Sequence, residues 1–171
     1  MERALLIIAP VNFRDEEFFE TKAILDKAGI QVTVAGKTTA IAKGKLGGTV
    51  KPDIALASVR IPDYDAVAFI GGSGAAVYFD DPQAHRIAKE AIEHHKLLAA
   101  ICIAPAILAR AGVLKGVKAT VFPDDAAELT ANGAEYTGKP VEKDGMIITG
   151  AGPEAAAEFG RAIADHLTRK D

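Results

Sequence analysis

The sequence predicts a three-layer α/β/α sandwich built around a mainly parallel β-sheet. Two features of the 171 residues support this fold class: short runs of consecutive apolar residues, and helical patterns that alternate with them. A strand that is apolar at every position is buried on both faces, which is typical of a parallel sheet with helices on both sides. The length fits one domain, so we expect residues 1–171 to form a single unit.

The N-terminal part predicts a strand, a helix and a second strand. Residues 4–9 (ALLIIA) and 30–35 (IQVTVA) are the two strands. Residues 15–28 between them have helical spacing, and Gly29 follows where a helix commonly ends. Such a unit joins parallel strands by a right-handed crossover. The apolar side of the helix is expected to comprise Phe19, Ala23, Ile24 and Leu25.

Residues 38–60 interrupt this alternation. They contain closely spaced glycines and a proline, which predict an added β-hairpin with an exposed edge. An exposed edge can pair with another chain, so we expect this segment to be a contact element of a homodimer or higher homo-oligomer.

The C-terminal part predicts five more strands and three more helices. The strands are expected at residues 66–70, 97–101, 117–121, 134–137 and 146–149. The helices are expected at residues 82–95, 104–111 and 154–169. Lys143, Asp144 and Gly145 supply the turn before the last strand.

Composition and charge disfavour several classes of function. The net charge is −3, aromatic residues make up 6% and tryptophan is absent, so we expect no nucleic-acid partner. The apolar runs are too short to span a bilayer, and the first residues lack a signal-peptide pattern, so we expect a cytoplasmic protein without a membrane partner. A single cysteine excludes an intramolecular disulfide and a multi-cysteine metal site, and we expect neither a metal nor a cofactor.

Cys102 is the first candidate for catalysis. It lies between the predicted strand 97–101 and the predicted helix 104–111, where a sharp turn raises a side chain above the sheet. The N–H groups at a helix N-terminus stabilise a thiolate and lower the pKa of such a cysteine. The alternative is a small buried side chain without chemistry, as in most free cysteines.

Two other segments follow predicted strands. Residues 71–74 (GGSG) allow the backbone to approach a ligand and offer N–H groups to an oxyanion, although a plain turn has the same composition. Asp15, Glu16 and Glu17 begin the first helix. The helix dipole favours acids there, so solvated capping is the alternative to a carboxyl group beside Cys102.

The histidines do not suggest a catalytic triad. All of them fall on predicted helices, away from the strand ends, and are expected to be solvated. They are His85, His94, His95 and His166.

Several segments together resemble the ThiJ/PfpI superfamily over essentially the whole chain. The similarity runs through NFRDEEFFE, YDAVAFIGGSGA, LLAAICIAPAILARAGVLKGVKAT and VEKDGMIITGAGP, in this order. The AICIAP segment followed by GVLKGVKAT is the specific part. The resemblance implies a flavodoxin-like or glutamine-amidotransferase-like sandwich.

The resemblance also implies roles for four residues. Cys102 matches the reactive cysteine, and Glu17 matches the glutamate that hydrogen-bonds its thiol. Asp15 and Glu16 are then expected to face solvent, because three adjacent helical positions cannot share one face. Gly72 and Ile103 match the positions whose backbone N–H groups form the oxyanion site. Protease-like members have a histidine in place of Ile103, and another branch has one in place of Phe122, so both imidazole partners are missing here.

The resemblance favours a cysteine-dependent enzyme acting on small α-oxoaldehydes such as methylglyoxal and glyoxal. Cys102 would add to the aldehyde and Glu17 would move a proton, giving a hydroxy acid; a deglycase acting on glycation adducts would use the same residues. A redox-responsive stress or chaperone-like protein that senses oxidation of Cys102 is the alternative. An intracellular peptidase or amidase is disfavoured by Ile103.

Overall fold

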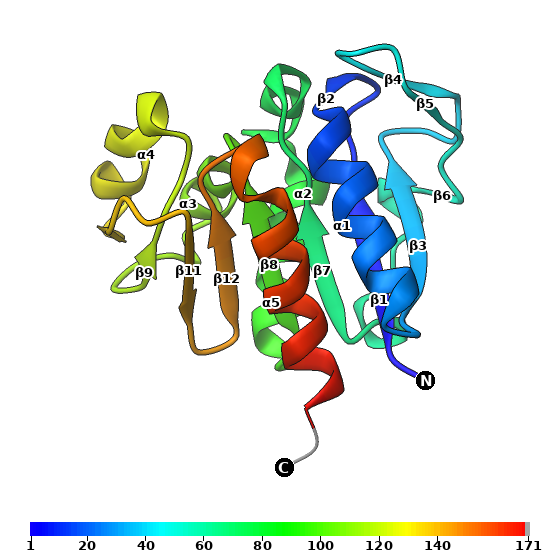
Figure 1. Ribbon diagram of the computed structural model, residues 1–171. Coiled ribbons are helices and arrows are strands. Elements are labelled where there is room, and N and C mark those ends of the chain that lie inside the picture. The colour runs from blue at the N-terminus through cyan, green and yellow to red at the C-terminus, as the bar shows by residue number, and fades with distance from the viewer. Residues whose placement is uncertain (170–171) are drawn as a thin grey trace.

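The computed structural model describes residues 1–169 and has a seven-stranded β-sheet at its centre (Figure 1). The strand order is β11-β12-β8-β7-β1-β3-β6. Neighbouring strands pair in parallel, except that β11 and β12 form an antiparallel hairpin. The strands are β1 (Arg3–Ile7), β3 (Gln31–Gly36), β6 (Ile54–Ala55), β7 (Ala66–Phe69), β8 (Leu97–Ile101), β11 (Val141–Asp144) and β12 (Ile147–Gly150).

Helices cover both faces of this sheet, so the predicted α/β fold class is confirmed. Figure 1 shows α1 (Asp15–Lys27) and α5 (Ala156–Thr168) packed together in front of the sheet. Behind it, α2 (Pro82–Glu93) packs against α3 (Pro105–Arg110). Because both faces are covered, β7 and β8 are buried at every position. Short 3₁₀ helices lie at Leu56–Ser58, Ile61–Asp63, Ser73–Tyr78 (η3), Pro123–Asp125 and Pro153–Ala155.

The predicted apolar side of α1 is partly wrong. The helix buries Phe18, Thr21 and Leu25, whereas Phe19 is 42% exposed. Phe19 instead stacks edge-on against Phe18, with ring centroids 5.0 Å apart. Leu25 is the only one of the four predicted positions that is fully buried.

The predicted hairpin over residues 38–60 is shorter than expected. β4 (Ala42–Gly44) and β5 (Thr49–Val50) pair antiparallel, and β2 (Val11–Phe13) extends them into a separate three-stranded sheet. The chain then returns to the main sheet as β6. Asp53 holds it there, because its N–H donates to the Val34 carbonyl and its carboxylate accepts from the Val34 N–H.

The remaining differences are short, polar or isolated elements. The predicted strands 117–121 and 134–137 form as the shorter β9 (Lys118–Ala119) and β10 (Glu135–Tyr136). These two strands pair with each other and not with the main sheet. The helix α4 (Ala126–Ala131) and the strands β2 and β11 were not predicted.

The topology places three loops at one edge of the sheet. β8, β7 and β1 are adjacent and parallel, with Phe69 aligned to Ile7 on one side and to Ala100 on the other. The segments that follow these strands therefore meet above their carboxyl ends, where ligands bind in open α/β sheets. They contain the start of α1, residues 71–74 and Cys102.

Asp15 connects the start of α1 to the small sheet. Its side chain is 8% exposed, and its two carboxylate oxygens accept the N–H groups of Leu46 and Gly48, each at 2.8 Å. Gly48 has no room for a side chain here, because a Cβ would lie 2.6 Å from the carboxylate. The expectation that Asp15 faces solvent is therefore wrong: two backbone amides, distant in sequence, take the place of water.

We predict that Asp15→Ala lowers the free energy of unfolding by about 1–3 kcal/mol, because it leaves two N–H groups without their acceptor. Urea unfolding followed by circular dichroism measures this change. Glu20→Ala, at an exposed position of the same helix, is the matched control and should change the free energy by less than about 0.5 kcal/mol. Equal effects of the two substitutions would contradict the prediction.

Candidate active site

Cys102 lies directly after β8 in a strained backbone conformation. Its φ is +64°, in the left-handed region that side chains other than glycine rarely adopt. Two hydrogen bonds hold it there: its N–H donates to the Gly150 carbonyl at 2.9 Å, and its carbonyl accepts the Phe122 N–H at 2.8 Å. The residue is 7% exposed. The end of β12 and the segment that follows β9 thus hold the backbone of Cys102 in place together.

Glu17 is the charged group brought next to this thiol. It is 0% exposed, and its Oε1 atom accepts the Gly71 N–H at 3.0 Å. Its Oε2 atom has no partner with full hydrogen-bond geometry in the described chain. A Cβ on Gly71 would lie 2.5 Å from Cys102 Cβ and 2.6 Å from Glu17 Oε1, so both side chains close around this glycine. Glycine is needed here because the two groups occupy its side-chain space.

Burial raises the pKa of both groups, and the charge of Glu17 raises that of Cys102 further. Burial raises the pKa of Glu17 to about 8, although the Cys102 thiol, the Gly71 amide and the charge of Arg14 act in the opposite direction. Burial and the charge of Glu17 raise the pKa of Cys102 to about 12. The expectation of a thiol pKa lowered by a helix N-terminus is therefore wrong. α3 begins only at Pro105, and burial of the sulfur, followed by the charge that Glu17 carries when ionised, raises the pKa of Cys102.

Two backbone amides act on the sulfur as donors. The N–H groups of Gly72 and Ile103 lower the pKa of Cys102, and neither has an oxygen acceptor within residues 1–169. Gly72 has φ +101°, and a Cβ on it would lie 2.4 Å from Asn12 O and from Arg14 N. Only glycine fits this turn, which brings the Gly72 amide to the same point as the Ile103 amide.

The neighbours of Glu17 in sequence have other partners. Glu16 is half-buried and pairs with the Arg14 guanidinium, whose Nη2 lies 2.9 Å from Glu16 Oε2. This ion pair lowers the pKa of Glu16. Of the three acids at the start of α1, Glu17 is the one turned to Cys102.

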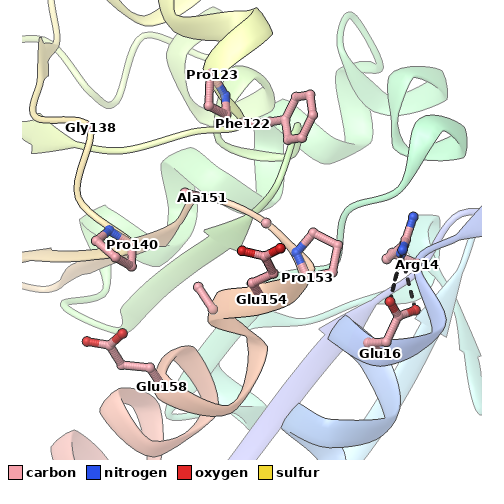
Figure 2. Close-up of a pocket in the computed structure, with 12 residues that line it drawn as sticks. Arg14, Glu16, Phe122, Pro123, Gly138, Pro140, Ala151, Pro153, Glu154 and Glu158 are labelled. Carbon is pink, nitrogen blue, oxygen red and sulfur yellow. Dashed lines mark hydrogen bonds and ion pairs between the residues drawn. The ribbon is translucent and has the colours of Figure 1, made fainter.

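Sequence reasoning missed Arg14 and the pocket that it lines. The pocket has a volume of about 850 Å³. Figure 2 shows the Arg14–Glu16 pair at one side of it and Glu154 nearer its centre. Phe122, whose N–H binds the Cys102 carbonyl, also lines it, so the pocket borders a residue that contacts the Cys102 backbone, although Cys102 itself is not among the lining residues. The other lining residues are Pro123, Gly138, Pro140, Ala151, Gly152, Pro153, Ala155 and Glu158.

The histidines belong to other parts of the fold. His85 lies in α2 and its Nε2 is 2.7 Å from the Phe79 carbonyl. His94 and His95 follow the end of α2, and His166 is in the last turn of α5. Within the described chain, no histidine is among the groups that shift the pKa of Cys102. The described residues also contain no cluster of metal-ligating side chains and no helix that is long and apolar enough to cross a membrane.

Known proteins share this architecture over nearly the whole chain. The sequence model of the DJ-1/PfpI family matches residues 2–166. Protein dj-1beta of Drosophila melanogaster is 35% identical over 170 residues, which are 98% of this chain and 90% of that protein. The crystal structure of that protein matches the structure of this chain with a TM-score of 0.90. The matched part covers 99% of this chain and 91% of the other.

Two further relatives are named for an activity. A glutathione-independent glyoxalase of Caenorhabditis elegans is 28% identical over 164 residues, 96% of this chain and 88% of that protein. A deglycase of Pyrococcus abyssi is 30% identical over 149 residues, 87% of this chain and 90% of that protein.

We predict that Glu17→Gln gains stability relative to the wild type as the pH rises from about 5 to about 8. In the unfolded chain Glu17 ionises near its ordinary pKa of 4.5, whereas in the folded chain it keeps its proton up to about 8. The folded wild type therefore binds the extra proton in this window and loses stability as the pH rises. Each unit of pKa difference corresponds to about 1.4 kcal/mol.

The measurement is urea unfolding of both proteins at pH 5, 6, 7 and 8. The difference between them should grow with pH by at least about 1 kcal/mol. A constant difference would show that the carboxyl group has the same affinity for protons in both states.

Proposed function

Because this chain belongs to the DJ-1/PfpI family, we propose that it converts small α-oxoaldehydes to hydroxy acids through Cys102 and Glu17. The observation that supports this most is the buried Glu17 carboxyl, whose pKa is raised to about 8 beside the thiol. A carboxyl group that titrates near neutral pH can both donate and accept a proton, as the isomerisation of an oxoaldehyde requires. The names of the glyoxalase and deglycase relatives point to the same chemistry.

Cys102 and Glu17 share one proton in the reactive form. Loss of a first proton from the pair leaves either a thiol beside a carboxylate or a thiolate beside a carboxylic acid. The second form lacks the repulsion that raises the pKa of Cys102, and the Gly72 and Ile103 amides stabilise its sulfur. This form is the nucleophile.

The first step joins the substrate to the protein. The thiolate forms a C–S bond with the aldehyde carbon, C1, and the resulting alkoxide takes the proton from the Glu17 carboxylic acid. The amides of Gly72 and Ile103 are close enough to stabilise the charge as it moves from sulfur to oxygen. The product is a hemithioacetal beside an ionised Glu17.

Proton transfer and hydrolysis complete the reaction. Glu17 removes the proton from C1 to give an enediolate, the hydroxyl proton on C1 moves to the C2 oxygen, and Glu17 returns its proton to C2. A thioester of Cys102 results. Water attacks its carbonyl carbon, the C–S bond breaks, and Glu17 takes a proton from the water. The sum is oxoaldehyde plus water giving the hydroxy acid, with no oxidant or reductant consumed.

We predict that the purified protein forms lactate from methylglyoxal, with kcat/KM rising as the pH increases through about 8, where the pair loses its first proton. Cys102→Ser should fold normally and form no lactate. Glu17→Gln should lose at least about 100-fold in rate, within the usual contribution of a general acid–base group. Lactate detection and the alkylation of Cys102 by iodoacetamide measure turnover and the thiol separately.

The outcomes of this assay separate the candidate functions. Lactate from Cys102→Ser would contradict the proposal. Without turnover, peroxide oxidation of Cys102 to a sulfinic acid, reducing two peroxides to water, would favour the redox-responsive alternative. Release of free amine from a glycated amino acid, without lactate from methylglyoxal, would favour a deglycase.

We predict that fluorogenic peptides and casein are not cleaved. Cleavage of an amide by a cysteine needs a group that protonates the leaving amine, usually an imidazole. Ile103 and Phe122 occupy the two positions at which the family resemblance implies a histidine in other members, and aldehyde addition has no leaving group. Peptide cleavage that disappears in Cys102→Ser would overturn this prediction.

A further inference from the structure

The backbone of Arg14 is fixed against the candidate active site. Its N–H donates to the Gly71 carbonyl at 2.9 Å, and its nitrogen lies where a Cβ on Gly72 would come within 2.4 Å. Gly71 in turn contacts Cys102, whose Cβ would be 2.5 Å from a Cβ at that glycine. The backbone of Arg14 therefore packs against the glycine pair Gly71–Gly72, and Gly71 also contacts Cys102.

The side chain of Arg14 is held in one orientation and keeps a free donor. Nε lies 3.1 Å from each carboxylate oxygen of Glu16, and Nη2 lies 2.9 Å from Oε2. These bonds fix the plane of the guanidinium. Nη1 has no hydrogen-bond partner within residues 1–169, and the side chain is 28% exposed at the pocket.

Around Arg14, the pocket offers little else to bind an anionic group. Phe122 and the prolines that line it are apolar, and Glu154 and Glu158 are acids that repel an extended anion. The positive charge of Arg14 also acts on the site, since it lowers the pKa of Glu17. Only a small anionic or polar group that binds close to Arg14 is attracted by this positive charge without being repelled by Glu154 and Glu158.

We propose that Arg14 orients the substrate by donating from Nη1 to the oxygen on the carbon next to the aldehyde. It thereby selects small α-oxoaldehydes and α-oxo acids over simple aldehydes. This role rests on the proposed addition of the aldehyde to Cys102. When Glu17 removes the proton from C1, negative charge develops on the C2 oxygen, and the guanidinium stabilises it.

Glyoxylate tests this role without any turnover. Its aldehyde can add to Cys102, and its carboxylate takes the place of the C2 oxygen beside Arg14, but the adduct cannot isomerise to a hydroxy acid. The measurement is the protection of Cys102 from iodoacetamide by increasing glyoxylate, compared with acetaldehyde, which has no oxygen at that position. Arg14→Gln should require about tenfold more glyoxylate, a typical loss for one charge-assisted hydrogen bond. Its protection by acetaldehyde should change less than about twofold.

Two further variants separate recognition from a structural role. Glu16→Gln removes the negative charge beside Arg14 but keeps a side-chain oxygen that can accept from the guanidinium and hold its plane, so glyoxylate should protect this variant at least as well as the wild type. Arg86→Gln removes another half-exposed arginine, 32% exposed and paired with Glu90 at i+4, and should behave as the wild type does. With methylglyoxal, Arg14→Gln should raise KM and lower kcat. The bound substrate and the enediolate both lose the hydrogen bond from Arg14 Nη1 to the C2 oxygen.

Equal weakening of glyoxylate protection in Arg14→Gln and Glu16→Gln would overturn the inference, because it would show that only the ion pair matters. So would a wild type that glyoxylate does not protect. Arg14-dependent protection without lactate from methylglyoxal would leave the recognition intact and contradict the proposed turnover.

Discussion

The hydrogen bond from the Gly71 amide to the buried Glu17 carboxyl determines the arrangement of the candidate active site. It joins the start of α1 to the loop after β7, and it does so within contact distance of Cys102. The bond satisfies one oxygen of a carboxyl group that has no access to water, and leaves the other without an oxygen or nitrogen partner. Burying this group is costly, and the raised pKa is the measure of that cost.

The fold and the places of Cys102 and the glycine pair at strand ends could be predicted because the relevant signals are local, whereas Glu17 was singled out only by the family resemblance. β1, β7 and β8 are apolar at nearly every position, and a strand end followed by a glycine pair or a lone cysteine is visible in the sequence. β11 was missed because its VEKD sequence carries charge at three of four positions and has no strand pattern of its own. It forms because β12 offers it a complete antiparallel partner.

The missed or misjudged site residues depend on contacts between segments distant in sequence. In the sequence, Asp15 has the pattern of a solvated acid at the start of a helix. In the folded chain, the small sheet lies over it and supplies two amide donors. Arg14 carries no periodic or motif signal; its value comes from Glu16 holding its plane and from the pocket that only the folded chain forms. The place of the thiol before a helix predicts a lowered pKa, but burial and the neighbouring charge of Glu17 raise the pKa of Cys102, and the helix begins only three residues later.

The left-handed backbone of Cys102 has a consequence for laboratory evolution. A cysteine at φ +64° and an unhydrated acid at Glu17 both make the native state less stable than the same fold would be with glycine and an apolar side chain at these positions. Selection of random variants for heat resistance alone would therefore enrich chains that have lost both groups. Such a library should be screened for thiol reactivity in parallel, because the most heat-resistant variants would otherwise lack a reactive thiol.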